Sequence, residues 1–170
     1  MPEPFREQFV RLFDAHFLRL YRYLDRLSGD PDLAADLAQE AFVKLYRRGA
    51  LPDAPTAWLI TVATNAFRNA RSTGARRHRL LTAARAEAVM ADPPPVPGES
   101  GAGTAPSERV RAALACLPER EREMLLLRAE GYSYREIAAA LELNEASVGS
   151  LLARAKRTFR ETYEGRSDAS

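Results

Sequence analysis

The chain has few of the residues from which disulfides, metal sites and many active sites are built. Its 170 residues include one cysteine, Cys116, and two isolated histidines, His16 and His78. A single cysteine excludes an intramolecular disulfide and fits a reducing cytoplasm, and the chain contains no CxxC or HExxH pattern. We therefore expect no cofactor, no metal and no enzymatic activity, and we expect Cys116 to be a small buried hydrophobic residue.

Long hydrophobic runs and lysine are also scarce. The longest charge-free stretch, residues 54–67, is too short to cross a bilayer, and the charged N-terminus lacks the apolar core of a signal peptide. We therefore expect a cytoplasmic protein without membrane insertion. Only two of the 25 basic residues are Lys, which is the usage of a GC-rich genome, and the net charge of +2 does not by itself indicate a nucleic-acid partner.

One segment divides the chain. Residues 91–107 contain three consecutive prolines, three glycines and no aromatic residue, a composition that predicts a disordered linker. It separates an N-terminal domain, residues 1–90, from a C-terminal domain, residues 108–164, which a short tail over residues 165–170 follows. Apolar residues recur at steps of three and four in both halves, and no alternating pattern appears, so the sequence predicts an all-α fold of two small helical domains.

Local signals place the ends of these helices. Ser28-Gly29 ends the first, Asp30 caps the second with Pro31 at its first position, and Pro55 begins the third. In the C-terminal half, Ser133 and Glu136 form a capping-box pattern, and Asn144 caps a last helix that ends near Tyr163. Two capped helices joined by a tight turn are typical of a helix-turn-helix.

The last helix has one apolar face and one small, polar and basic face. Val148, Leu152, Ala155 and Phe159 fall within about 40° of one another on a helical wheel. Short side chains near the N-terminus of the opposite face suit the major groove, and arginines further along suit phosphates. The alternative is a solvated helix whose cations complement the helix dipole. The opposite face carries Ala146, Ser147, Ser150, Ala153, Arg154 and Arg157.

The third helix ends in a basic stretch. From Arg68 to Arg85 there are six arginines, one histidine and no acid, and Asn65 and Asn69 lie one helical turn apart just before or within it. Such a run neutralises phosphates, and amides at this spacing can hydrogen-bond base edges. Trp58 can stack on an unpaired base, although it also fits the core. The alternative is a solubilising helix end.

The second helix places Asp36, Gln39, Glu40 and Lys44 on one side. Asp36 and Glu40 are one turn apart, which raises the possibility of a metal-dependent nuclease, but the sequence supplies no further ligands. The face is otherwise a solvated surface or an acidic docking surface for a basic partner, flanked by Phe42 and Tyr46.

Together these segments resemble one family, the bacterial RNA polymerase sigma factors of the extracytoplasmic-function group. The resemblance lies in the patterns DxxQExF, LPxxxRExxLLR and GxSYxEIA, read here as DLAQEAF, LPEREREMLLLR and GYSYREIA. With the flanking segments FVRLFDAHFLRLYRYL, PTAWLITVATNAFRNARSTGARR and LNEASVGSLLARAKRTFRETY, it covers nearly everything except the linker and the tail.

The resemblance implies a function and partners. The N-terminal half would be the region-two domain, which docks on the β′ clamp helices of core RNA polymerase and opens and reads the −10 element of promoter DNA. The C-terminal half would be the region-four domain, which reads the −35 element and touches the β flap. An anti-sigma factor would hold the protein inactive. Carried over to this chain, the polymerase contacts are Asp36, Gln39, Glu40 and Phe42; the −10 contacts, with the loop over residues 51–55, are Trp58, Asn65, Arg68, Asn69, Arg71, Arg76 and Arg77; and the −35 contacts are Tyr134, Arg135, Ala146, Ser147, Ser150, Arg154 and Arg157.

The chain departs from the family where members often carry Lys and Arg and this sequence has Gly149 and Leu151. Phosphate anchoring is therefore expected to shift onto Tyr134, Arg135 and the two arginines of the last helix. A different class of protein stays open as an alternative: a stand-alone helix-turn-helix repressor or activator, which binds its site tightly without polymerase and usually as a dimer.

Overall fold

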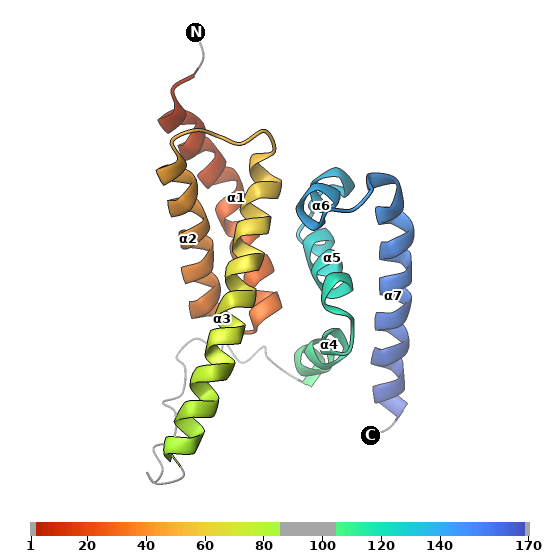
Figure 1. Ribbon diagram of the computed structural model, residues 1–170. Coiled ribbons are helices and arrows are strands. Elements are labelled where there is room, and N and C mark those ends of the chain that lie inside the picture. Colours follow the sequence, from red (N-terminus) through yellow and green to blue (C-terminus); the bar gives the residue numbers. More distant parts are fainter. Residues whose placement is uncertain (1–2, 86–104, 169–170) are drawn as a thin grey trace.

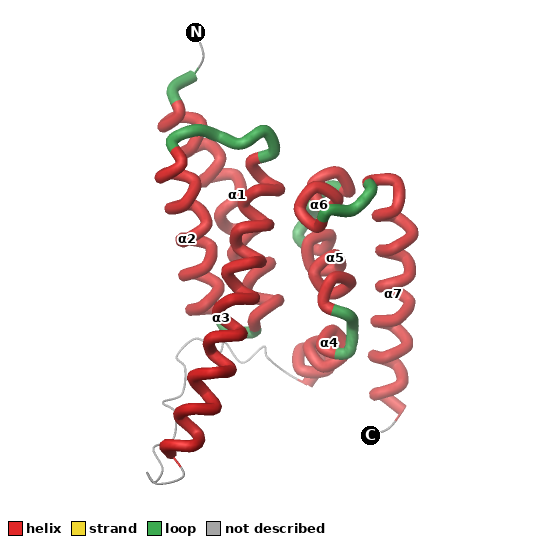
Figure 2. Tube along the Cα trace, in the orientation of Figure 1, coloured by secondary structure: helices red, strands yellow, loops and turns green. Residues whose placement is uncertain are grey.

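The computed structural model describes residues 3–85 and 105–168, and nearly all of these lie in helices (Figures 1 and 2). The predicted all-α fold is confirmed, because the described residues contain no strand. Figure 1 shows two groups of helices side by side, one from each half of the chain. In chain order the helices are α1 (Phe5–Ser28), α2 (Pro31–Arg48), α3 (Pro55–Arg85), α4 (Ala105–Ala115), α5 (Glu119–Ala129), α6 (Tyr134–Leu141) and α7 (Glu145–Asp168).

The N-terminal group is a three-helix bundle whose turns follow the predicted signals. Gly29 ends α1 with φ 70°, a left-handed conformation that glycine adopts without steric cost. The Asp30 side chain accepts hydrogen bonds from the backbone N–H groups of Asp32 and Leu33, both at 3.1 Å, and so begins α2. The last turns of α3 project beyond α1 and α2 (Figure 1).

The core of this bundle contains one internal polar contact. Leu24, Leu45 and Ala63, from the three helices, are fully buried. Among them the Tyr23 hydroxyl and the Thr64 hydroxyl lie 3.0 Å apart and share a hydrogen bond between α1 and α3. Because burial removes water as a partner, the Tyr23 hydroxyl depends on Thr64, and the pair links α1 to α3.

The C-terminal group contains the predicted helix-turn-helix. The Ser133 side chain accepts from the Glu136 N–H at 3.1 Å, and the Glu136 carboxylate accepts from the Ser133 N–H at 2.8 Å, which confirms the capping box at the start of α6. Glu142 ends α6 with φ 56°, and the Asn144 side chain accepts from the Ala146 N–H at 3.1 Å at the start of α7.

Three details differ from the prediction. Helix α4 begins at Ala105, inside the predicted linker, because Pro106 falls in its first turn, where no backbone donor is needed; residues 91–104 lie outside the described part. Helix α7 continues past Tyr163 to Asp168, because no proline interrupts it. Cys116 is exposed rather than buried, since it lies in the turn after α4, where its sulfur accepts from the Arg166 side chain at 3.3 Å.

Candidate nucleic-acid interface

The acidic face of α2 is open to solvent. Asp36, Gln39 and Glu40 are all exposed, and Glu40 forms an ion pair with Lys44 at 2.9 Å. Within residues 3–74 and 108–166, whose side chains the structure describes, no group of three or more His, Cys, Asp or Glu could hold a metal ion. Asp36 and Glu40 therefore have no companion ligands here for the metal chemistry of a nuclease.

Phe42 is much less exposed than the other predicted polymerase contacts of α2. It is 2% exposed and packs against Phe9, Phe13 and Phe17 of α1, with ring centroids 5.0–6.0 Å away. The small part of Phe42 that stays exposed lines a surface groove beside Gln39. The exposed apolar side chains next to Gln39 are instead Phe13, Val43 and Tyr46, of which Tyr46 is 55% exposed. Together with Phe9, Gln39, Phe42 and Arg47 they line a shallow groove of about 320 Å³.

The candidate residues of α3 fall into four groups. Asn65, Asn69 and Arg71 are exposed. Trp58 is partly buried and packs against the core, which was the alternative to stacking on a base. The helix includes Arg76 and Arg77, but their side chains lie outside the described part. Arg68 differs from all of these because its side chain forms ion pairs with the C-terminal domain.

Arg68 forms the most extensive polar contact between the two domains. Its Nη2 donates to both carboxylate oxygens of Glu123 in α5, at 2.7 and 2.8 Å, and its Nε lies 3.4 Å from Glu119. Burial raises the pKa of the Glu123 carboxyl, and the hydrogen bonds from Arg68 offset part of that increase. Burial acts to lower the pKa of Arg68, but the pairing with Glu123 outweighs it and the net shift is upward. The carboxyl is thus the more strongly desolvated member of the pair.

Further contacts join α1 and α3 to the C-terminal domain. Arg19 donates to the Glu130 carbonyl at 3.1 Å and lies 4.5 Å above the Tyr132 ring, and Arg26 pairs with the Glu130 carboxylate at 3.2 Å. The Thr61 hydroxyl lies 3.2 Å from the Ala140 carbonyl of α6 and 2.9 Å from the Ala57 carbonyl of its own helix, so its one hydrogen is shared between the two. The two domains therefore pack closely in this structure, and they do so over the face of α3 that carries Arg68.

The predicted face of α7 is free of such contacts. Ala146, Ser150, Arg154 and Arg157 are exposed and Ser147 is partly exposed, whereas Val148, Leu152 and Ala155 are buried, as the helical wheel predicts. At the start of α6, Arg135 is exposed and Tyr134 is 40% exposed, with the Arg128 guanidinium 5.0 Å from its ring. Leu151 packs against the core, and a side chain at Gly149 would meet the Tyr134 ring at 3.5 Å. Neither departure from the family pattern therefore lies at the centre of the exposed face.

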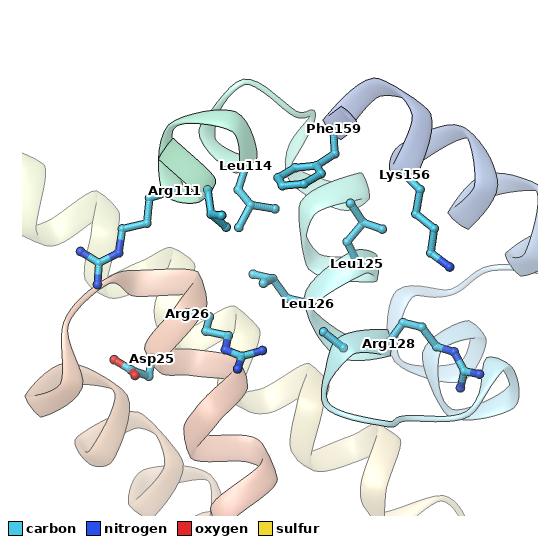
Figure 3. A pocket seen from close by; sticks show the side chains of 11 residues that line it. Asp25, Arg26, Arg111, Leu114, Leu125, Leu126, Arg128, Lys156 and Phe159 are labelled. Carbon is cyan, nitrogen blue, oxygen red and sulfur yellow. The ribbon is translucent and has the colours of Figure 1, made fainter. Parts of the chain in front are cut away.

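A groove of about 950 Å³ lies where the end of α1 meets α4, α5 and α7 (Figure 3). Leu114, Leu125, Leu126 and Phe159 point into it and form an apolar floor. Four cations and a single acid stand around this floor, so the rim is basic. The charged residues of the rim are Arg26, Arg111, Arg128, Lys156 and Asp25.

The sequence did not reveal the burial of Glu123, the groove or the exposure of Phe13. A signal for Glu123 was present, because it shares one helix face with Leu126 and Leu127, at steps of three and four. A carboxylate within an apolar face indicates a buried cationic partner. No comparable signal identified Arg68 as that partner.

Both halves of the chain match descriptions of one family. Sigma-70 region 2 matches residues 12–77, and Sigma-70, region 4 matches residues 107–159. The matches fall on the three-helix bundle and on the helix-turn-helix domain. In the part of the chain that the structure describes, no helix is long and apolar enough to cross a membrane.

Curated relatives carry the same family name. The chain is 35% identical over 147 residues to the probable RNA polymerase sigma factor RfaY of Xanthomonas campestris pv. campestris, which covers 81% of this chain and 36% of that protein. It is 32% identical over 152 residues to the ECF RNA polymerase sigma factor SigE of Mycolicibacterium smegmatis, which covers 86% and 58%. The matches thus span about a third of the first relative and less than two thirds of the second.

A solved structure shares the fold. The sigma factor RpoE from Bartonella quintana, in complex with the anti-sigma factor NepR, superposes with a TM-score of 0.63 at 24% identity, covering 93% of this chain and 98% of that one. This similarity includes both helical domains. Two region matches in the expected order, named relatives and a shared fold agree: the chain belongs to the sigma-70 family of RNA polymerase sigma factors, in the extracytoplasmic-function group.

Proposed function

We propose that this chain is a promoter-specificity subunit: it binds core RNA polymerase and directs initiation by recognising −10 and −35 elements. The observation that carries the proposal is that one chain contains two surfaces. One is the exposed acidic face of the region 2 bundle, and the other is the exposed face of α7 in the region 4 helix-turn-helix, whose short side chains suit the DNA major groove. A stand-alone regulator needs only the second of these. Core polymerase and promoter DNA are cytoplasmic, so the protein would act there and catalyse no reaction of its own.

In this proposal α2 docks on the β′ clamp helices. Asp36, Gln39 and Glu40 supply polar contacts, and Phe13, Val43 and Tyr46 add apolar contact area beside them. Phe42 supports the aromatic residues beside it and adds a small edge to the floor of the same groove. A mixed surface of this kind, with an exposed aromatic residue next to charged ones, is typical of protein interfaces.

The −35 element would be read by the N-terminal half of the α7 face. Ala146, Ser147 and Ser150 are small enough to let the helix enter the major groove, while Arg154, Arg157 and Arg135 reach phosphates. The −10 strand would bind along α3, at Asn65, Arg68 and Asn69, with the arginines beyond them adding sequence-independent affinity. The β flap contact has a candidate place in the groove between α4, α5 and α7, whose apolar floor suits a helix with an apolar face.

The test uses purified chain and core polymerase. We expect specific binding to promoter DNA, and run-off transcription, only when both are present. Gln39→Ala together with Glu40→Ala should weaken the association at least tenfold in a pull-down. The fold should stay intact, because exposed side chains of this kind contribute under about 1 kcal/mol each to stability. The matched control is Glu7→Ala with Gln8→Ala, the same pair of residue types on α1. Equal association of both double variants would remove the docking claim, and tight specific DNA binding by the free chain would favour the stand-alone regulator.

A further inference from the structure

The N-terminal half of the exposed face of α7 is poor in groups that hydrogen-bond a base edge. From residue 145 to residue 153 the sequence contains no Asn, Gln, His, Lys or Arg. The exposed side chains opposite the buried stripe in this half are Ala146, Ser150 and Ala153, and the neighbouring Gly149 adds no side chain. Two of these three side chains are single methyl groups, so the part of α7 that would lie deepest in the major groove is largely apolar.

The one hydroxyl near the centre of this face has its hydrogen engaged within the helix. The Ser150 hydroxyl donates to the Ser147 carbonyl at 3.1 Å, so its oxygen is left as an acceptor. In the major groove adenine and cytosine present an amino donor, whereas the groups that guanine presents are both acceptors. Ser150 therefore suits the amino group of an adenine, the base that pairs with thymine, and offers nothing to a guanine.

The longer polar side chains around this face are engaged or lie elsewhere. The Asn144 Oδ1 accepts from the Ala146 N–H at 3.1 Å as the cap of α7, and the bidentate pairing of an asparagine with adenine needs that oxygen. Glu145 lies about 60° from Val148 on the helical wheel, nearer the buried stripe than the exposed face. Arg154 lies about 13 Å beyond the first residue of α7, whereas a recognition helix contacts base edges with its N-terminal residues. Arg154 therefore suits a phosphate rather than a base.

We propose that α7 reads an A·T-rich −35 element through thymine methyl groups, with Ala146 and Ala153 each contacting the C5-methyl of one thymine and Ser150 accepting from an adenine amino group. The inference rests on the proposed function of α7. Apolar contact with the thymine methyl is the base readout open to an alanine side chain. The two alanines are seven residues apart, about 10 Å along the helix, so their thymines lie about two to three base pairs apart. Each contact favours thymine over uracil about fourfold, the effect of burying one methyl group.

The first experiment identifies the preferred element. Core polymerase reconstituted with the purified chain selects from a promoter library in which the −35 and −10 windows are both randomised, and the bound duplexes are sequenced. We expect an enriched −35 element in which A·T pairs dominate and two thymines recur at the stated spacing. An element whose invariant positions are guanines would overturn the proposal, because no amide, imidazole or cationic side chain of α7 precedes Arg154.

The same selection separates this inference from the proposed function. An enriched −10 element with no preference in the −35 window would overturn the methyl readout and keep the function. No enrichment in either window, together with no run-off transcription from any template, would reject the function itself.

The second experiment removes the methyl groups one at a time. Each thymine of the selected −35 element is replaced by deoxyuridine, which keeps the base pair and removes only the C5-methyl. Two of these replacements should each weaken binding of the reconstituted polymerase about fourfold, and the others should leave it unchanged. Unchanged binding for every replacement would refute the proposal. This measurement uses the unaltered chain, so it does not depend on whether a variant folds.

Two glycine variants assign each methyl contact to its alanine. In Ala146→Gly the uracil penalty should disappear at one thymine and persist at the other, and Ala153→Gly should show the reverse. Each variant is the control for the other, because both loosen the helix and a persisting penalty shows that α7 still lies in the groove. Penalties that are the same in both variants as in the unaltered chain, or that vanish together in either variant, would contradict the assignment to these two alanines.

Discussion

The hydroxyl pair between Tyr23 and Thr64 makes a quantitative prediction about what holds α3 in place. The two oxygens lie 3.0 Å apart, and the residues are 0% and 3% exposed. Removing either hydroxyl leaves the other buried, so the cost depends on whether the remaining group can find a second partner. Tyr23 lies in α1, and its hydroxyl has no backbone group of its own helix within reach, whereas a helical threonine can turn toward the carbonyl one turn earlier, as Thr61 does toward Ala57 at 2.9 Å.

The expected costs are therefore unequal. Tyr23→Phe should destabilise the bundle by about 1 kcal/mol, because the Thr64 hydroxyl can then turn to the backbone carbonyl one turn earlier. Thr64→Val should cost about 2 kcal/mol, because the tyrosine hydroxyl is left without any partner. The double variant should cost no more than Thr64→Val alone, since no orphaned hydroxyl remains. The non-additive part is then about 1 kcal/mol or more.

Urea unfolding, followed by far-UV circular dichroism on the four proteins, measures these differences. For a domain of this size, 1 kcal/mol also corresponds to about 4–8 °C in the melting temperature. Strict additivity, or a larger loss in Tyr23→Phe than in Thr64→Val, would refute the reasoning. Leu24→Ala serves as a reference for an apolar core loss in the same helix, about 2–5 kcal/mol, which shows that the assay resolves such changes.

Three further predictions concern other parts of the chain. Arg154→Ala should weaken binding of holoenzyme to −35 duplex and reduce the salt slope by about one contact, unlike Arg160→Ala at the far end of α7; an unchanged slope means that Arg154 does not contact phosphate. Burial, with Arg19 nearby, lowers the pKa of His16 below its usual 6.5, while Glu136 acts in the opposite direction. The folded state thus prefers the neutral ring, so stability should be full above pH 6.5 and fall as the pH drops through the lowered value, and His16→Gln should lose this dependence in urea titrations at a series of pH values. Ser133→Ala removes the capping box and should cost about 1 kcal/mol in thermal unfolding; no change would mean that the cap is not formed in solution.

The predictions that succeeded depend on residues close together in the sequence. Asp30 and Ser133 cap helices through hydrogen bonds to backbone groups two or three residues away, so both partners lie in one short segment of the sequence. The buried face of α7 follows in the same way, because the 3.6-residue period fixes which side chains align with Val148. Such features could be predicted without knowing how the helices pack.

The features that the sequence did not predict depend on distant partners. The aromatic residues of α1 pack over Phe42 and leave little of it exposed, and nothing within α2 indicates that packing. Arg68 and Glu123 are separated by 55 positions and by the segment between the domains, so no local pattern relates them. The predicted burial of Cys116 was wrong for a different reason. Helix α4 ends at Ala115, one residue earlier, so Cys116 lies in the turn and is exposed.

Gly131 follows α5 at φ 89°, a conformation that residues with side chains rarely adopt. A Cβ atom there would also meet the Nη2 of Arg19 at 3.2 Å, and Arg19 belongs to the other domain. Glycine is therefore needed at this position for two reasons: the positive φ of the turn after α5, and the close approach of Arg19 from the N-terminal domain. Any replacement would strain the local backbone even in an isolated C-terminal fragment, and in the whole chain it would also push a guanidinium away from the Tyr132 ring. Measuring the loss of stability from one substitution in the fragment and in the full-length protein would therefore separate the cost of backbone strain from the cost of the contact with Arg19.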